Sequence, residues 1–153
     1  MQTAAVCIGD VTITTAFRRR TSRTPNAHAE LAALKHLSQF LAAEPHIFFN
    51  QLAEVLVHAC GAGSSGVTLE ERRGPCGGLR WVSGAGQVTP KPGDRVPSHG
   101  PSGIVMGSQQ AEVFQRPERF YTCLQQDILV FEELLVVPLG LRDGRHGTVW
   151  IAS

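Results

Sequence analysis

The spacing of apolar residues changes once along the chain, near Gly61. Before that point Leu31, Leu34, Leu37 and Leu41 recur every three or four residues, which is the period of one face of an α-helix. After it the apolar runs are short, rich in β-branched residues and bounded by Gly and Pro, as is typical of strands. A chain that places helices before several short strands is expected to form an α+β domain with an antiparallel sheet.

Two helices are predicted in the first part of the chain. Asn26 is a suitable N-cap for the first, and Pro45 stands at a permitted first-turn position of the second. Gly61 is expected to end the second helix. Residues 1–25 precede this pattern and carry the basic run 18–20, so we interpret them as an extended or poorly ordered lead-in before a domain that spans 26–153.

The second part of the chain predicts two hairpins separated by an irregular connection. The pattern 134–137 is a continuous apolar run, as expected of a central strand that is covered on both faces. Too many Gly and Pro residues interrupt 84–103 for a regular element. The expected order is a hairpin of 66–71 and 79–83, the irregular segment 84–103, short extended pieces at 104–106 and 111–114, a brief helix over 117–126, and a hairpin of 133–141 and 146–152.

Composition excludes several classes of protein. The 153 residues, 42% of them hydrophobic, suit one domain with a core. A formal net charge of +1 gives no overall attraction to nucleic acid or membrane. No apolar run is long enough for a membrane span, and no secretory signal follows Met1, so a cytoplasmic protein is expected. The four cysteines are widely spaced, which favours reduced thiols.

None of the familiar catalytic or metal-binding patterns is present in the sequence. There is no Cys-x-x-Cys pair, no His pair one helical turn apart and no Gly-x-Ser-x-Gly elbow. The adjacent carboxylates at 70–71 and 132–133 would point to opposite faces of a strand and could not share a proton. We therefore expect no metal, no catalytic residue and no enzymatic activity of the domain itself.

Several short sequence motifs occur in the same order as in GAF domains, and together they resemble that family from about residue 14 to residue 153. The motifs are LAE at 52–54, CGAGSSGVTLEE at 60–71, LRW at 79–81, GAG at 84–86, FQRPERF at 114–120, ELLVVPL at 133–139 and GTVWI at 147–151.

The resemblance implies a PAS-like fold with a six-stranded antiparallel sheet, helices on one face and a loop-roofed pocket on the other. It also implies a sensory role in a bacterial two-component or phytochrome-related protein, in which the domain binds a small molecule, dimerises through its flanking helices and controls a downstream module such as a histidine kinase. Relatives continue into a C-terminal helix and an output domain, and these are expected beyond Ser153.

The pocket implied by the resemblance has a predicted set of wall residues. They are Trp81, His99, Ser102, Phe114, Phe120 and Tyr121. The identity of the ligand, and of any cofactor, stays open.

Two further functions are known for domains that look like this one. Some resemble free methionine sulfoxide reductases with closely placed cysteines, but here Ser102 stands where such relatives carry a thiol. Others attach a tetrapyrrole through a cysteine in the region of Cys123, which here is followed by Leu124 instead of the more common His. Both are kept as alternatives to the sensory role.

Overall fold

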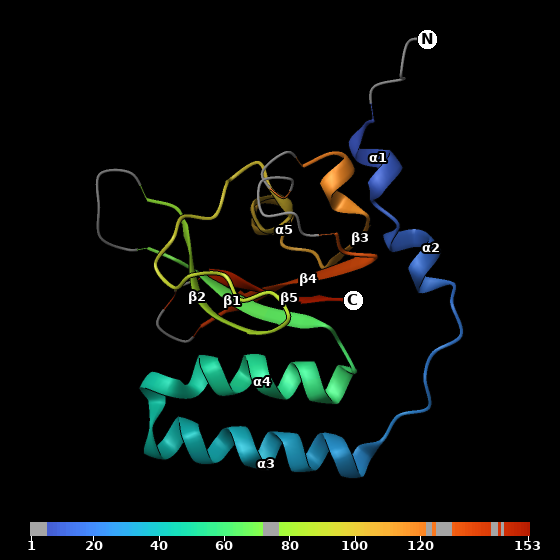
Figure 1. Ribbon diagram of the computed structural model, residues 1–153. Helices are drawn as coiled ribbons and strands as arrows, with labels where there is room; N and C mark the ends of the chain where they lie inside the picture. Colours follow the sequence, from blue (N-terminus) through green and yellow to red (C-terminus); the bar gives the residue numbers. More distant parts are fainter. Residues whose placement is uncertain (1–5, 72–76, 122–123, 125–129, 142–143, 145) are drawn as a thin grey trace.

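One antiparallel sheet organises the chain, in a computed structural model that describes residues 6–71, 77–121, 124, 130–141, 144 and 146–153 (Figure 1). Its strands lie in the order β2-β1-β5-β4-β3. Five strands are present in the described part of the chain, so the expected number of six is wrong there. The strands are β1 (Ser64–Glu70), β2 (Leu79–Gly86), β3 (Glu112–Gln115), β4 (Glu133–Gly140) and β5 (His146–Ala152). Both predicted hairpins are confirmed, as β1 with β2 and β4 with β5.

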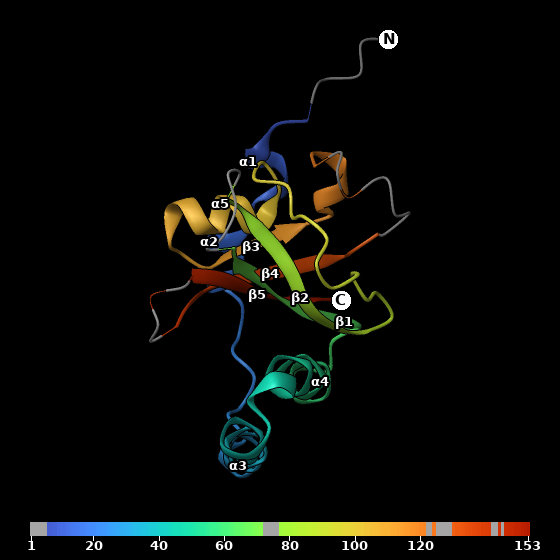
Figure 2. The same ribbon diagram turned by 90° about the vertical axis from the view of Figure 1, so that its left-hand side faces the viewer.

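The two predicted helices, joined by the short 3-10 turn η1 (Pro45–Ile47), form a hairpin on one face of the sheet. Helix α3 (Ala27–Ala43) is capped by the Asn26 side chain, which accepts a hydrogen bond from the Ala29 amide at 3.0 Å. Helix α4 (Phe48–Cys60) ends at Gly61, whose φ of 62° is the left-handed conformation that glycine adopts without strain. Figure 2 shows α4 against the sheet and α3 outside it.

Hydroxyl groups of two strands fasten α4 to the sheet. The Ser65 hydroxyl donates to the Ala53 carbonyl at 2.7 Å, and the Ser83 hydroxyl donates to the Phe49 carbonyl at 2.9 Å. Among the strands, β1 and β2 make the main contacts with α4. Val137 of β4 is therefore 36% exposed on this face, and the expectation that 134–137 is covered on both faces is wrong.

The opposite face of the sheet carries α5 (Pro101–Ser108), which packs against β4 and β5. The sequence predicts an extended piece at 104–106, and the structure shows helix instead. Pro101 at the first position fixes a helical φ, and the apolar side chain of Val105 is fully buried against the sheet. Burial of that side chain outweighs the low helix propensity of the two glycines in this segment.

Two segments between residues 8 and 18 are helical and packed, which differs from an extended lead-in. Two short helices, α1 (Ile8–Val11) and α2 (Thr14–Arg18), lie beside the edge strand β3. Val11 is fully buried, the Ile13 amide donates to the Val113 carbonyl at 2.8 Å, and the Val113 amide donates to the Thr14 hydroxyl at 2.9 Å. Backbone groups of β3 that would otherwise face water are satisfied in this way.

The main core lies between the sheet and α5. Its buried members come from α1, α5, β3, β4 and β5 and from the segment after η2 (Pro117–Arg119); they are Val11, Val105, Phe114, Tyr121, Phe131, Leu134, Val136, Trp150 and Ala152. Among the described residues, no helix is both long and apolar enough to cross a membrane.

Candidate functional site

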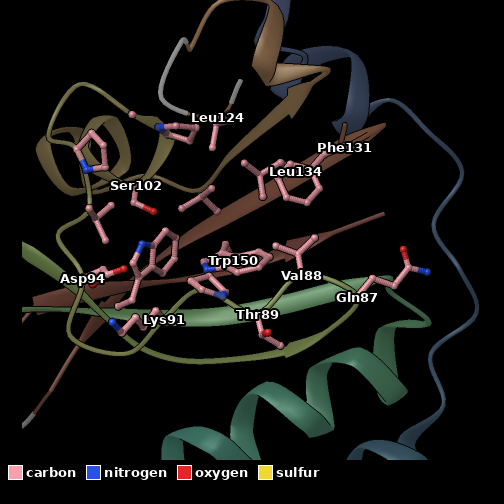
Figure 3. A pocket seen from close by; sticks show the side chains of 17 residues that line it. Gln87, Val88, Thr89, Lys91, Asp94, Ser102, Leu124, Phe131, Leu134 and Trp150 are labelled. Atoms are coloured by element: carbon pink, nitrogen blue, oxygen red, sulfur yellow. The ribbon is translucent and has the colours of Figure 1, made fainter. Parts of the chain in front are cut away.

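A pocket opens on the α5 face of the sheet, between the first turn of α5 and the loop 87–100 (Figure 3). Its volume is about 460 Å³, within the usual range for small-molecule sites. Strands β4 and β5 form its floor with Leu134, Val136 and Trp150, and Phe131 and Leu124 close one end. The remaining wall residues come from β2, the loop and α5, and are Trp81, Gln87, Val88, Thr89, Pro90, Lys91, Asp94, Val96, Pro97, Gly100, Pro101 and Ser102.

Both tryptophans of the chain line this pocket. The Trp81 and Trp150 rings meet edge to face, with centroids 5.8 Å apart and planes at 79°. Trp150 can lie across β1 because its neighbour there is Gly66, where an added Cβ would stand 2.7 Å from the indole Nε1 and Cζ2 atoms. The missing side chain of Gly66 thus determines the shape of the pocket floor.

The loop wall is held to the sheet by backbone contacts. The Gln87 amide donates to the Gly63 carbonyl at 2.9 Å, and the Val88 amide donates to the Ser64 hydroxyl at 2.9 Å. At Gly84 the backbone approaches Pro90 so closely that a Cβ would lie 2.7 Å from the proline Cδ. These contacts couple this segment of the pocket wall to β1 and β2.

Three buried hydroxyls run from the sheet to the first turn of α5. The Thr68 and Thr148 oxygens are 2.7 Å apart, and the Thr148 and Ser102 oxygens are 3.1 Å apart. Thr68 and Thr148 are fully buried and Ser102 is 5% exposed. Figure 3 shows the Ser102 hydroxyl pointing into the pocket. The chain of hydroxyls therefore brings a polar group to an otherwise apolar interior.

Among the described residues that line the pocket, two are charged and both lie at its rim. They are Lys91 and Asp94, and both are exposed. The Trp150 Nε1 atom is buried without a hydrogen-bond partner in the described part of the chain, and it lies over the Gly66 backbone. The arrangement suits a mostly apolar ligand that is oriented by few polar contacts.

The structure brings two of the sequence-predicted wall residues to this pocket, Trp81 and Ser102. His99 lines a separate concavity, together with Arg80 and Arg95.

The other predicted residues lie elsewhere. Phe114 and Tyr121 are in the core, with ring centroids 5.8 Å apart, and Phe120 packs on Tyr121 at 4.9 Å; none of the three lines the pocket. Cys123 lies outside the described residues.

Sequence reasoning missed the tryptophan of β5 and the apolar floor of β4. Thr148 and Trp150 are two residues apart in β5, so their side chains point to the same face of the sheet. If the pairing of β1 with β5 were known, this pattern would place Trp150 on the same side as its partner Gly66. The pairing itself is a long-range contact that no local pattern contains.

In the part of the chain that the structure describes, no group of three or more potential metal ligands occurs. Cys7 and Cys60 are exposed free thiols, while Cys76 and Cys123 lie outside the described residues.

The fold matches solved structures of GAF domains. The GAF domain of a phosphoenolpyruvate-protein phosphotransferase from Coxiella burnetii superimposes with a TM-score of 0.59 at 14% identity, covering 84% of this chain and 80% of that one. The nlh2 GAF domain of A. aeolicus gives 0.58 at 19% identity, covering 82% and 79%. At these identities the likeness shows the fold, and the chain has the GAF fold.

An enzyme of known structure is similar as well. Free methionine-R-sulfoxide reductase from Neisseria meningitidis, solved with its substrate, gives a TM-score of 0.60 at 19% identity and covers 88% of this chain and 80% of that one. No family model matches the sequence, and no curated protein matches it significantly.

Proposed function

We propose that this chain is a regulatory domain of a signal-transduction protein, which binds a small organic molecule in the pocket beside α5. The observation that carries the proposal is the pocket itself: about 460 Å³, with both tryptophans in its walls and, among its described lining residues, a single buried hydroxyl, that of Ser102. The output module we propose is a histidine kinase of a two-component system, in keeping with the resemblance of the sequence.

Strand β1 gives the pocket a direct mechanical connection to the helices. Its residues alternate between the two faces of the sheet. The Ser64 hydroxyl accepts from the Val88 amide of the pocket wall, whereas the next residue, Ser65, is bonded to the Ala53 carbonyl of α4. A ligand that has different affinities for two conformations of the loop would favour one of them on binding. The hydrogen bonds of β1 would then transmit the change to α4.

Helix α3 is the surface through which we propose that the domain dimerises. Leu31, Leu34 and Leu41 are 51%, 65% and 60% exposed, and their spacing puts them on one stripe of the helix. Leu34 and Leu41 are one heptad apart, as in the seam of a helical bundle. A second copy of α3 would cover this stripe and would place the signal at the subunit interface.

The first experiment is a thermal-shift screen of small organic molecules, followed by titration calorimetry of the hits. Because both tryptophans line the pocket, binding should also change the intrinsic tryptophan fluorescence. Trp81→Leu should weaken binding at least ten-fold, an order of magnitude that matches the loss of an aromatic contact of about 1.4 kcal/mol.

The control for that variant is Phe17→Leu, which changes an aromatic residue of α2 that does not line the pocket. Hits that bind wild type, Trp81→Leu and Phe17→Leu equally well would place the ligand elsewhere and would contradict the proposal. So would a screen of a diverse library that yields no binder.

The similarity to a methionine sulfoxide reductase supports one alternative, a thiol enzyme. That reaction needs two cysteines that become paired when the enzyme is oxidised. Thiol titration before and after treatment with free methionine sulfoxide tests it: the regulatory proposal expects all four thiols to remain. Loss of two thiols together, with release of methionine, would favour the enzyme.

Covalent attachment of a tetrapyrrole at Cys123 would appear as added mass on that residue after incubation with the pigment.

A further inference from the structure

The direction of the hydroxyl chain determines which hydrogen-bonding group faces the pocket. The Thr148 amide donates to the Thr68 oxygen at 3.2 Å, so Thr68 already accepts one bond. If Ser102 donated to Thr148 and Thr148 to Thr68, the Thr68 hydrogen would be fully buried without an acceptor, which is costly. In the opposite direction Thr68 donates to Thr148 and Thr148 donates to Ser102. The Ser102 hydrogen is then free to donate into the pocket.

One backbone donor of the same residue accompanies that hydroxyl. Pro101 begins α5 and has no amide hydrogen, so the first amide of the helix is that of Ser102, which lines the pocket, whereas Gly103 lines the other concavity. The Ser102 amide has no hydrogen-bond partner in the part of the chain that the structure describes. The start of a helix also carries a partial positive charge of about half a unit. This end of the pocket therefore presents donors and positive potential.

The rest of the pocket restricts the shape and the charge of the ligand. The Trp81 ring and the apolar floor around Val136 offer flat contact surfaces. Lys91, the one cation among the described residues that line the pocket, is exposed and is offset by Asp94 on the same rim. A phosphate dianion would lack a full countercharge here, whereas a carboxylate spreads a single charge over two acceptor oxygens.

We propose that the pocket selects a planar aromatic carboxylate, with its ring against Trp81 and its carboxylate on the hydroxyl and the backbone amide of Ser102. The inference rests on the proposed ligand-binding function and adds the chemical class of the ligand. Selection comes from donors that the fold leaves unpaired.

A matched set of probes tests the inference on the full chain by titration calorimetry at neutral pH. The probes are 2-naphthoate, its uncharged amide 2-naphthamide, and cyclohexanecarboxylate, which keeps the charge without the aromatic ring. We expect 2-naphthoate to bind about ten-fold more tightly than either of the other two.

Variants of Ser102 connect that preference to the hydroxyl. Ser102→Ala and Ser102→Cys should reduce the preference for naphthoate over naphthamide to about three-fold, since neither supplies a strong donor. Ser102→Cys fills the buried space, which separates loss of the donor from a cavity. Ser108→Ala changes a hydroxyl at the far end of the same helix, bonded to the Val105 carbonyl, and should leave the preference unchanged. Lys91→Met should change it less than Ser102→Ala.

The outcomes separate the two proposals. Equal binding of naphthoate and naphthamide overturns the carboxylate inference and leaves a small-molecule pocket in place. A preference lost in Lys91→Met but kept in Ser102→Ala and Ser102→Cys also overturns it, because the charge is then recognised at the rim. Failure of all three probes to bind also overturns the carboxylate inference. The thermal-shift screen of a diverse library, with the Trp81→Leu variant, tests the proposed ligand-binding function independently.

Discussion

At the scale of single residues, Gly66 controls the floor of the pocket. Nothing larger than hydrogen fits there, because a Cβ would stand 2.7 Å from the Ser83 carbonyl oxygen as well as from the Trp150 indole. The indole can cross β1 and meet Trp81 only with that space empty. A glycine in the middle of a strand, which normally weakens it, is here explained by the close approach of a neighbouring ring.

Gly66→Ala should lower the free energy of unfolding by about 2 kcal/mol, because the backbone and the indole must both shift. Gly107→Ala is the matched control: a Cβ at Gly107 meets nothing within 4 Å, and alanine favours the helix by about 0.5–1 kcal/mol. Urea unfolding measures both. Equal effects of the two substitutions would contradict the account of the floor.

The buried hydroxyls make a second prediction at this scale. Thr148→Val removes the acceptor of the Thr68 hydrogen and should cost about 1–3 kcal/mol of unfolding free energy. The double variant Thr68→Val/Thr148→Val removes both partners and should cost less than the sum of the two single variants. Additive losses in a double-mutant cycle would show that the two hydroxyls do not act as a pair.

At the scale of elements, the N-terminal helices belong to the domain through α1. Val11 is fully buried against the main core, while the Arg20 to Glu133 ion pair, 2.6 Å between nitrogen and oxygen, lies at the surface. The hydrogen bonds to Glu133 raise the pKa of the Arg20 guanidinium, which is charged at neutral pH in any case. The packing of α1 and α2 on the rest of the domain therefore depends more on the burial of Val11 than on this ion pair.

Val11→Ala should destabilise the domain by about 2 kcal/mol, the transfer free energy of the lost methyl groups plus a cavity. It should also increase protease cleavage within residues 12–25. Arg20→Met should have a smaller effect that vanishes in high salt, because exposed ion pairs are screened. Denaturant unfolding at two salt concentrations compares the variants. A larger loss of unfolding free energy in Arg20→Met than in Val11→Ala would show that the ion pair, and not apolar burial, stabilises the packing of these helices.

The elements also show what could be predicted from the sequence. Asn26 and Gly61 cap α3 and α4, and such local signals gave the two helices and the hairpins. Helix α5 was missed because its glycines argue against a helix, and only the sheet beneath Val105 supplies the compensating burial. Within the pocket, Trp81 and Ser102 were predicted, but Phe114 and Tyr121 were not separable from true wall residues. Which side chain faces a cavity depends on long-range strand pairing.

At the scale of the whole molecule, the exposed leucines of α3 predict self-association. Leu34→Glu should shift the protein from dimer to monomer at micromolar concentration, because the charge would be buried in the α3 seam. Lys35→Glu, at an exposed neighbouring position, is the matched control. Analytical ultracentrifugation distinguishes the outcomes, and a wild-type protein that is monomeric at every concentration would contradict the dimer.

We expect the regulatory molecule to bind in the pocket beside α5. The two indole N–H signals in a nitrogen–proton correlation spectrum test it most directly, because the only tryptophans of the chain, Trp81 and Trp150, line that pocket. A ligand found by the thermal-shift screen should move both signals at the concentration at which it stabilises the protein, and Trp81→Phe assigns them. A stabilising ligand that leaves both indole signals in place would show that the pocket is not the site.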